Sequence, residues 1–469
     1  MQLTHFFLLA TASTVLAVPA LDAETENVLD LIAHAKPNQK GSPSTEHLAR
    51  RRNDILARRR LSRRQTYPNA NVNENLIGIG GRIYITNVTV ASQKFALVID
   101  TGSSDTWLPT TNFQCQDPNS GNAIPNSNCG FPSYYNRAGS STYSSINYPF
   151  SVNYTDGEYL QGDMGTELIG IGGVSRGQNP VATVRQTIGA VTNGYWMGDG
   201  VSSGVMGLAY PALARGINNR QLTYTPILYT LFQSTSPSIP PVFSLALRRP
   251  TTSQPNAGGA LAIGGIPAGV SNDGRWVQVP IQPISQGIYA FYSINIDGFD
   301  ITPPSATTTT TAATATPTGP YATSQQNMII DSGTSLLYFP NQIAQYIASL
   351  FNPPARYNSN TNIYLVQCTA QAPRIGVRIG GQSYFISRDD LMNTGPGAVG
   401  GSTVGANPGE CALAVQNGMG GTLVLGDTFL KNVLVVFDLA NATDIGPGGS
   451  DAKKNGGGAV RIAGREVYS

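Results

Sequence analysis

Histidine is almost absent from this chain of 469 residues, which contains only His5, His34 and His47. Because all three lie before residue 65, residues 65–469 contain no histidine. Ser-His-Asp and Cys-His mechanisms need an imidazole as the general base, and histidine is also the commonest metal ligand. The sequence therefore excludes a histidine-based hydrolase over residues 65–469, and we expect no metal and no cofactor.

Charged side chains are also scarce, since Asp, Glu, Lys and Arg together make up only 12% of the sequence. Glycine and proline are abundant instead, with 52 and 31 residues. This composition favours short β-strands joined by many turns over bundles of helices. No apolar run approaches the roughly 18 residues that a membrane-spanning helix needs, so we expect no membrane association.

The N-terminus carries one short apolar stretch, FFLLATASTVLAVPA, over residues 6–20. An apolar core of this kind that ends in small residues is typical of a signal peptide. Val15 and Ala17 suit the positions before a cleavage site, which predicts that residues 1–17 are removed. The first five residues contain no Lys or Arg, which is unusual for a signal peptide, so a buried N-terminal strand is the alternative.

Residues 50–64, RRRNDILARRRLSRR, contain eight arginines. Alone, such a run would indicate nucleic-acid binding or nuclear import. Behind a signal peptide it is better interpreted as the end of a pro-segment, residues 18–64, that is cleaved between Arg64 and Gln65. This segment holds ten of the 29 basic and six of the 27 acidic side chains, so the mature chain has a formal charge of −2. We therefore expect no nucleic-acid partner.

The chain has only four cysteines, Cys115, Cys129, Cys368 and Cys411. Four cysteines allow three pairings, and we favour Cys115–Cys129 with Cys368–Cys411 because each bond then stays within one half of the chain. Disulfides are expected in the oxidising environment that a signal peptide implies. The absence of any CxxC pair argues against a zinc site built from all four.

Short runs of β type make up most of residues 76–180, among them RIYITNVTV, KFALVID and FSVNY, and turn residues separate them. The best helical candidate is NQIAQYIASLF, residues 341–351. Residues 302–326 are rich in Thr, Ala and Pro, which predicts an extended surface loop that is a candidate for O-linked glycosylation. The Gly-rich tail after Asp444 is expected to be mobile in part. Asn-X-Thr sequons, which are candidate glycosylation sites, occur at Asn87, Asn153 and Asn441.

One acidic turn occurs twice. The stretch LVIDTGSSDTW places Asp100 at the end of an apolar run, and MIIDSGTSLLY does the same with Asp331, 231 residues later. Each turn is followed by an apolar-apolar-Gly stretch, GVMGLAYP in the first half and TLVLGDTF in the second. A buried, unpaired charge is costly, so each carboxylate needs a partner. The repeat predicts two homologous lobes, residues 65–270 and 271–469, that face each other and bring the two acids together.

Two neighbouring carboxylates cannot both ionise readily and share one proton. The ionised group can take a proton from water, while the protonated group polarises a peptide carbonyl. Such a pair can hydrolyse an amide without a metal, a histidine or a covalent intermediate. Gly102 and Gly333 would let backbone N–H groups approach the carboxylates, and the hydroxyls of Ser103 and Thr334 would hold their outer oxygens.

On these motifs, together with FSLAL, LAIGGIP and LVLGDTFLKNVLVVFDLAN, the chain resembles the pepsin-like aspartic endopeptidases, particularly their secreted fungal members. The resemblance spans roughly residues 76–445. It implies an all-β, mostly antiparallel, two-lobed fold with a central cleft for an extended peptide and a β-hairpin flap over the cleft. It also implies that Asp100 and Asp331 are catalytic, and that Gly102, Gly333 and Thr334 contact the substrate.

The resemblance places the flap at VNYTDGEYLQG, residues 152–162. Tyr154 then matches the flap tyrosine of the family, and Trp107 matches the supporting tryptophan that hydrogen-bonds it. Core packing of the two aromatic residues is the alternative interpretation. Thr155 stands where glycine is common, and the segment after the flap tip is one residue longer than expected, so the register of the flap is open.

Asp156 matches the position just before the flap-tip glycine, Gly157. If the flap closes as in the relatives, the Asp156 carboxylate reaches the pocket for the substrate residue before the cut. A Lys there could bury its alkyl stem and offer its ammonium to the acid. Glu158 could take this role if the register differs by two residues, and a purely structural role for Asp156 in the hairpin turn is a further alternative.

The preferred hypothesis is a secreted, monomeric endopeptidase that cleaves polypeptides at acid pH beside large apolar residues, with a vacuolar location as the less favoured alternative. A second hypothesis is an inactive relative that binds peptides or proteins in its cleft. The loss of one acid would favour that hypothesis, but both acids are present. A third hypothesis is a structural cell-wall glycoprotein, suggested by the Thr-rich loop. It does not explain the duplicated acidic turns.

Overall fold

A computed structural model of the chain describes residues 67–465, apart from 80, 155–156, 215–223, 235–237, 252, 255, 286, 305–319, 393–406, 408, 419 and 440–456. The expected signal peptide, the pro-segment and its cleavage site between Arg64 and Gln65 lie outside the described residues. So do Asp156, the sequon residue Asn441 and most of the Thr-rich loop. These predictions therefore stay predictions.

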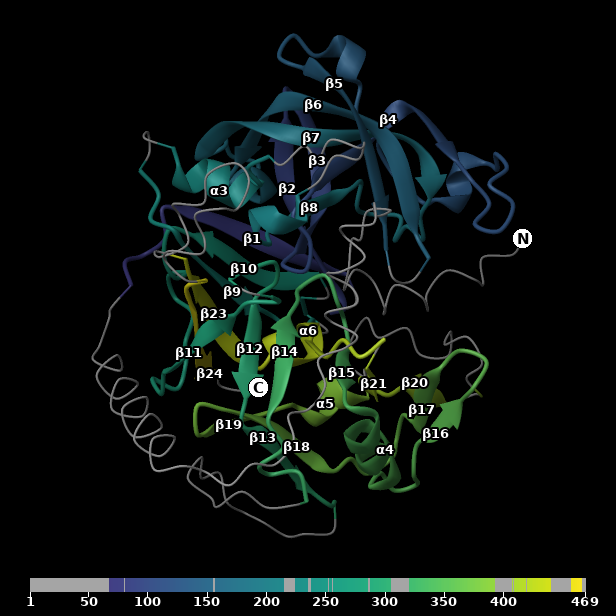
Figure 1. Cartoon of the computed structure of the whole chain (residues 1–469), viewed down its shortest axis with the longest axis vertical. Helices are drawn as coiled ribbons and strands as arrows, with labels where there is room; N and C mark the ends of the chain where they lie inside the picture. The colour runs from purple at the N-terminus through teal and green to yellow at the C-terminus, as the bar shows by residue number, and fades with distance from the viewer. Residues whose placement is uncertain are drawn as a thin grey trace.

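Over the described residues the fold is all-β, and the strands there form one 18-stranded sheet and two sheets of three strands. The first half of the chain supplies ten strands: β1 (Val72–Ile79), β2 (Ile83–Val90), β3 (Gln93–Asp100), β4 (Thr106–Cys115), β5 (Ser144–Asn153), β6 (Tyr159–Ile171), β7 (Ala182–Tyr195), β8 (Val205–Gly207), β9 (Val242–Leu247) and β10 (Ala257–Ile263). Figure 1 shows β2 to β8 in the upper part of the molecule.

The second half supplies the remaining described strands: β11 (Val277–Gln282), β12 (Ser293–Ile296), β13 (Gly298–Thr302), β14 (Gln326–Ile330), β15 (Leu337–Phe339), β16 (Arg356–Asn358), β17 (Ile363–Gln367), β18 (Arg374–Ile379), β19 (Gln382–Phe385), β20 (Glu410–Ala412), β21 (Val415–Asn417), β22 (Val424–Leu425), β23 (Val433–Asp438) and β24 (Ala459–Gly464). Strands β12 to β21 lie in the lower part of the molecule, so the chain has the expected two-lobed form (Figure 1).

Helices are few and short: α3 (Ile227–Phe232), α4 (Asn341–Ser349), α5 (Arg388–Leu391) and α6 (Asp427–Leu430), with 3₁₀ turns at Asn126–Asn128, Arg137–Gly139, Val174–Arg176 and Pro211–Leu213. Helix α4 confirms the helix expected near residues 341–351. It buries Ile343, Ala344, Ile347 and Ala348, whose spacing places them on one face. Among the described helices, none has the length and apolar character needed to cross a membrane.

A ladder of antiparallel strands joins the two halves of the chain in the order β1, β10, β9, β23, β24, β11. The central pair is β9 with β23, in which Leu245 lies opposite Val435. Every residue of β9 is buried, as expected for a strand with partners on both edges and covered faces. The ladder holds the lobes in one arrangement and so sets how their acidic turns face each other.

The tail after Asp444 contains a feature that the sequence analysis missed. Residues Ala459–Gly464 form β24, which pairs with β23 on one edge and β11 on the other. Val460 and Ile462 are fully buried in this strand. The segment therefore completes the ladder between the lobes. The strand was missed because its short apolar alternation follows a glycine-rich stretch, which suggested a mobile tail.

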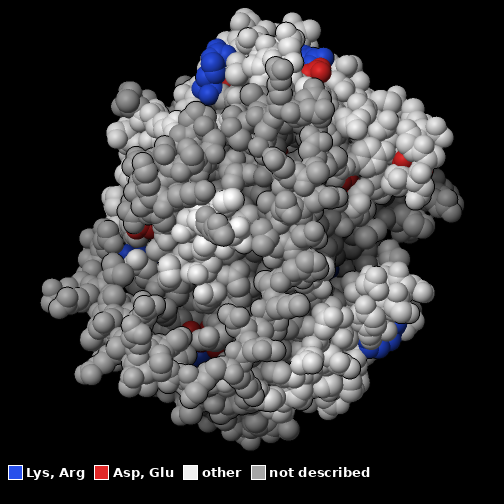
Figure 2. Space-filling model, viewed as in Figure 1, with Lys and Arg blue, Asp and Glu red and all other residues white. Residues whose placement is uncertain are grey.

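Both disulfides have the pairing that the sequence favoured, Cys115 with Cys129 and Cys368 with Cys411. The first closes the loop that follows β4, and the second joins the end of β17 to β20. On the face shown in Figure 2, the described basic and acidic side chains lie in small, separate groups.

Glu74 in β1 is fully buried, and Gly172 N–H donates a hydrogen bond to its Oε1. Burial raises the pKa of Glu74 to about 7, against the smaller lowering effect of hydrogen bonds from Gly172 and Thr86. The folded protein therefore holds a proton here up to about pH 7, whereas the unfolded chain releases it near pH 4.5. The folded state binds more protons in this window, so the free energy of unfolding must fall as pH rises through it.

We expect Glu74→Gln to flatten this pH dependence, because the amide stays neutral and its oxygen can still accept the bond from Gly172. Between pH 4.5 and 7.5 the free energy of unfolding should fall by about 3 kcal/mol less in the variant than in the wild type. Urea unfolding across this pH range measures the difference.

Glu167 is the matched control. Burial tends to raise its pKa, but hydrogen bonds from Ser140, Thr142 and Tyr135 outweigh burial and lower it. Its contribution is therefore present at neutral pH and lost as pH falls, so Glu167→Gln should destabilise at pH 7. Equal pH profiles for wild type and Glu74→Gln would contradict the proposed role of Glu74.

Candidate active site

Asp100 and Asp331 meet where the two lobes face each other. Asp100 is the last residue of β3, which pairs in parallel with β8, and Asp331 follows β14, which pairs in parallel with β22. Both side chains are fully buried. A Cβ atom placed on Gly102 would lie 2.7 Å from the Cγ and both Oδ atoms of Asp331, so the two turns are in close contact. The duplicated motif therefore corresponds to one site with two similar halves.

Each carboxylate receives the same pair of hydrogen bonds. Gly102 N–H donates to Oδ1 of Asp100 at 2.7 Å, and Gly333 N–H donates to Oδ1 of Asp331 at 2.8 Å. The outer oxygens accept from hydroxyls, Asp100 Oδ2 from Ser103 Oγ and Asp331 Oδ2 from Thr334 Oγ1 at 2.6 Å. These four donors hold the carboxylates in fixed orientations and are the groups that the sequence analysis named.

Thr101 and Ser332 join the two turns directly. Thr101 Oγ1 donates to the Ile330 carbonyl at 3.0 Å and accepts from Ser332 N–H at 2.9 Å. Ser332 Oγ donates to the Ile99 carbonyl at 3.0 Å, and Thr101 N–H donates to Ser332 Oγ at 3.2 Å. Because these bonds cross from one lobe to the other, they fix the separation of the acids. The sequence analysis assigned no role to either residue.

Burial raises the pKa of Asp100 and of Asp331, because the charged form of either carboxyl is poorly solvated there. The negative charge of Asp100 raises the pKa of Asp331 further, and the two carboxyl groups are hydrogen-bonded to each other. Hydrogen bonds from Ser103 and Gly102 act in the opposite direction on Asp100 and favour its ionised form. The pair therefore holds one proton over a wide pH range, and its apparent pKa values belong to the pair.

The hairpin between β5 and β6 lies beside this site, since Glu158 and Asp100 line the same pocket. Trp107 Nε1 donates to the hydroxyl of Tyr154 at 2.8 Å, as the resemblance implies. Gly157 has φ +95°, and the Tyr154 and Glu158 main chains are hydrogen-bonded across the turn at 2.8 Å. Burial and then the charge of Asp100 raise the pKa of Tyr154, which places its ring close to the acidic pair.

A pocket lies beside Asp100, and its volume is about 440 Å³ when the space open to solvent is included. Its apolar lining includes Val98, Trp196 and Val205. Glu158 and Asp199 also line it, although the sequence analysis considered Glu158 only as an alternative to Asp156 and did not consider Asp199. The loop before β8 brings Asp199 to the pocket, and only the tertiary structure shows this.

Asp427 is a further buried acid that the sequence analysis missed. It begins α6 and is fully buried, and neither of its side-chain oxygens has a hydrogen-bond partner among the described residues. Burial raises its pKa, Lys431 lowers it, and the charges of Asp331 and Asp100 raise it again. Asp427 N–H donates to the Thr334 carbonyl at 2.7 Å, so α6 supports the loop that holds Asp331. The Asp in TLVLGDTF was the available signal.

The remaining predicted residues lie away from the acids. Asn87 lies in the middle of β2 and is half-buried, and its main-chain N–H donates to Ser175 Oγ at 3.1 Å. Asn153 is the last residue of β5 and is also half-buried.

A proton-sharing pair of buried carboxyl groups beside a pocket is suited to general acid-base hydrolysis with a water molecule as the nucleophile. Its ionised oxygen can accept a proton and its protonated oxygen can donate one.

Comparisons with known proteins agree with this chemistry. The family model described as eukaryotic aspartyl protease matches residues 83–446. A probable aspartic-type endopeptidase of Aspergillus fumigatus is 34% identical over 93% of this chain and 96% of its own length. Candidapepsin-3 of Candida albicans is 25% identical over 80% of both chains, and aspartic protease 6 of Caenorhabditis elegans is 25% identical over 79% and 83%. The chain belongs to the eukaryotic aspartyl protease family and is an aspartic-type peptide hydrolase.

Proposed function

We propose that this protein is a secreted endopeptidase that cleaves peptide bonds at acid pH, with Asp100 and Asp331 as its catalytic pair. The observation that carries the proposal is the pair itself: two fully buried carboxyl groups in contact, each held by one main-chain N–H and one hydroxyl. Secretion is supported by the expected signal peptide and by a relative named secreted aspartic protease 3 in Candida albicans, 25% identical to this chain.

In the proposed reaction the ionised carboxylate takes a proton from a water molecule as the water oxygen attacks the peptide carbonyl carbon. The protonated carboxyl group donates its proton to the carbonyl oxygen, which gives a neutral tetrahedral diol. Return of a proton to the nitrogen and loss of one from a diol hydroxyl then break the C–N bond. One water is consumed, an acid and an amine are released, and the pair again holds one proton.

The pH dependence follows from this single proton. At high pH both carboxyl groups lose their protons and no general acid remains, and at very low pH no general base remains. Because burial raises both pKa values, the singly protonated state extends through mildly acid conditions. The hydrogen bonds from Ser103 and Gly102 favour the ionised form of Asp100, and this keeps a base available at lower pH.

Substrate selection is proposed to follow the surface beside the pair. The pocket next to Asp100 has apolar walls that include Val98 and Val205, which supports a preference for large apolar side chains around the cut. A Lys before the cut would also be accepted if an acid of the flap met its ammonium. The sequence favoured Asp156 for that contact. The enzyme is further proposed to act as a monomer on extended polypeptides.

Mass spectrometry of the fragments made from a denatured protein at pH 3.5 and pH 7 tests the proposal. We expect internal cleavages at pH 3.5, enriched in apolar residues around the cut, and complete inhibition by a statine-type mimic of the tetrahedral diol. If the purified enzyme, freed of its pro-segment, makes no internal cuts in the substrate at any acid pH, the proposed function is overturned.

Activation is proposed to require removal of residues 18–64. The basic end of this segment would be attracted to the acidic cleft at neutral pH, and the attraction would weaken as carboxylates protonate near pH 4. The double variant Arg63→Ala with Arg64→Ala should therefore be secreted as a longer precursor that is largely inactive at neutral pH. N-terminal sequencing provides the measurement, and a double variant that still begins at Gln65 would show that the cleavage site is wrong.

A further inference from the structure

One loop forms a wall of the pocket beside Asp100. This loop, residues 196–202, follows β7 and contributes Trp196, Met197 and Asp199 to the pocket lining. Inside it, Asp199 Oδ1 accepts hydrogen bonds from the main-chain N–H groups two and three residues later, at 2.7 Å and 2.6 Å. The loop, which we call the pocket loop, therefore has internal bonds that hold its own shape.

The disulfide between Cys115 and Cys129 braces the pocket loop. Cys115 ends β4 and lies opposite Gly194 in the parallel pairing of β4 with β7, directly before the loop. Cys129 Sγ lies 3.6 Å from the Gly194 carbonyl oxygen. The main chain at Cys129 also packs against the loop, because a Cβ atom on Gly198 would collide with the Cys129 carbonyl oxygen. Both cysteines are fully buried, so the disulfide and the loop form one packed unit.

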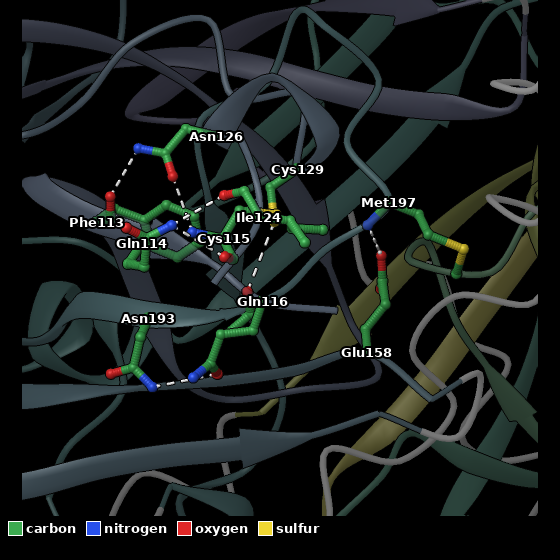
Figure 3. The surroundings of a disulfide bond; sticks show 11 residues. Phe113, Gln114, Cys115, Gln116, Ile124, Asn126, Cys129, Glu158, Asn193 and Met197 are labelled. Atoms are coloured by element: carbon green, nitrogen blue, oxygen red, sulfur yellow. Dashed lines mark hydrogen bonds between the residues drawn. A yellow bond between two sulfur atoms is a disulfide. The ribbon is translucent and has the colours of Figure 1, made fainter. Parts of the chain in front are cut away.

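Glu158, in the hairpin between β5 and β6, is tied to this loop. Its Oε1 accepts a hydrogen bond from Met197 N–H at 2.6 Å, and only 2% of the residue is exposed. Figure 3 shows the Glu158 carboxylate directed toward the Met197 main chain. Because the donor belongs to a braced loop, the bond holds the hairpin at one distance from that loop. Both residues line the same pocket, so this bond also sets how wide the pocket is.

The tie also affects Tyr154, which lies across the hairpin turn from Glu158. Tyr154 N–H donates to the Glu158 carbonyl at 2.8 Å, so the two main chains must shift together. The Tyr154 ring packs edge-on against Trp196, with 5.6 Å between the ring centroids. After burial, the charge of Asp100 raises the pKa of Tyr154, which places the ring near the acidic pair. A displaced Glu158 would therefore displace Tyr154 from the pair and from the pocket loop.

From these contacts we infer that Glu158 is a positioning residue, which ties the hairpin to the braced pocket loop and keeps the pocket formed before a ligand enters. The inference rests on the proposed endopeptidase function and concerns every substrate, not one substrate side chain. Without the tie, the hairpin would also occupy positions in which the pocket is not formed. The apparent affinity for a ligand then falls in proportion to the fraction of molecules that have a formed pocket.

Glu158→Ala is expected to raise KM and the dissociation constant of a statine-type inhibitor about tenfold at pH 5. The change in kcat should be less than about twofold, because a bound ligand restores the pocket and the acidic pair is unaltered. Two peptides that differ only in the residue before the cut, Lys or norleucine, should lose affinity by the same factor. The reason is that the tie acts on the hairpin and not on one substrate side chain.

Glu158→Gln keeps an oxygen that can accept from Met197 N–H, so it should recover most of the affinity that Glu158→Ala loses. Asp163→Asn is the control in the same hairpin. Asp163 is an exposed acid of β6 that pairs with Arg137 at 2.8 Å, and its replacement should leave KM at the wild-type value.

The double variant Cys115→Ser with Cys129→Ser tests the brace and is expected to raise KM in the same direction. Adding Glu158→Ala should raise KM by less than the product of the two separate factors, because the tie has little effect when the loop itself is not held. Cys368→Ser with Cys411→Ser is the matched control. It removes the disulfide that joins the end of β17 to β20 and should leave KM unchanged.

Hydrogen exchange of the substrate-free protein gives a measurement that needs no activity. At pH 5, mass spectrometry should show faster exchange over residues 194–202 in Glu158→Ala than in the wild type, and exchange close to the wild-type rate in Glu158→Gln. This measurement also decides the inference if the cysteine double variant does not fold.

Unchanged KM, inhibitor affinity and hydrogen exchange in Glu158→Ala would overturn the inference. A loss of affinity confined to the Lys peptide would also overturn it, as would equal losses in Glu158→Gln and Glu158→Ala, because the carboxylate would then act through its charge. If the wild type cuts neither the peptides nor a denatured protein, the proposed function is overturned, and hydrogen exchange still decides whether Glu158 holds the pocket loop.

Discussion

Replacing either Asp100 or Asp331 by asparagine is expected to abolish peptide hydrolysis, with a fall in kcat of at least about 10⁴-fold. The two carboxyl groups hold one proton between them, and an amide can neither accept a proton from water nor transfer one to a carbonyl oxygen. Because the acids act as one unit, the double variant should cost little more than either single variant. Initial rates on a fluorogenic peptide at pH 3.5 and pH 5 provide the measurement.

The folded state of both single variants can be verified by circular dichroism and by binding of a statine-type inhibitor. Asp163→Asn, which removes an exposed acid of β6, should retain wild-type activity. Burial raises the pKa of both Asp100 and Asp331, so the neutral amides should also lessen the fall in stability as pH rises. Appreciable turnover by a folded single variant would contradict a catalytic pair at these positions.

Gly102→Ala is the second change with a large expected effect. The added Cβ would lie 2.7 Å from the Cγ and both oxygens of Asp331, well inside normal contact, so one of the turns must move. Gly102 N–H is also the donor to Oδ1 of Asp100 at 2.7 Å, and a shift of the turn would alter both carboxylates together. A displacement of about 1 Å at reacting groups can cost on the order of 10²-fold in rate.

We therefore expect kcat/KM of Gly102→Ala to fall by about 10²-fold or more, with only a small change in the melting temperature. The backbone of Gly102 does not lie in the left-handed region, so alanine can adopt its conformation and the effect is the clash with Asp331. Peptide hydrolysis at acid pH together with thermal unfolding separates loss of geometry from loss of fold. Wild-type activity in this variant would contradict the close contact between the Gly102 turn and Asp331.

Much of the site could be predicted from local patterns. The apolar alternation of KFALVID predicts a strand that ends at Asp100, and β3 ends there. The 3.6-residue spacing in NQIAQYIASLF predicts a helix, which α4 confirms two residues shorter at its C-terminal end. The repeated Asp-[Thr/Ser]-Gly turn predicts that two carboxylates share one site, because each alone would be an unpaired buried charge. The strand and the helix depend only on residues that are neighbours in sequence, whereas the shared site follows from the repetition of the turn.

Other features depend on residues that are far apart in sequence, and no local pattern indicates them. Thr101 and Ser332 exchange hydrogen bonds across 231 positions, and they could be identified only after the lobes had been placed face to face. In the sequence, Asp427 is an ordinary residue after a glycine. Its burial beside the acidic pair is seen only in the tertiary structure. The sequence indicates Glu158 only as an alternative to Asp156, and the hydrogen bond from Met197 N–H to its carboxylate is seen only in the tertiary structure.

The sequence alone predicts the chemistry of this protein, because a duplicated acidic turn and a histidine-free chain after residue 64 favour paired carboxyl groups as the means of hydrolysis. Only the tertiary structure decides how those groups are held and what lies around them. The clearest case is β24, a short strand after a glycine-rich stretch that is placed between β23 and β11. Its stability comes from partners on both edges and from buried Val460 and Ile462, which are contacts that exist only once β11 and β23 have been brought together.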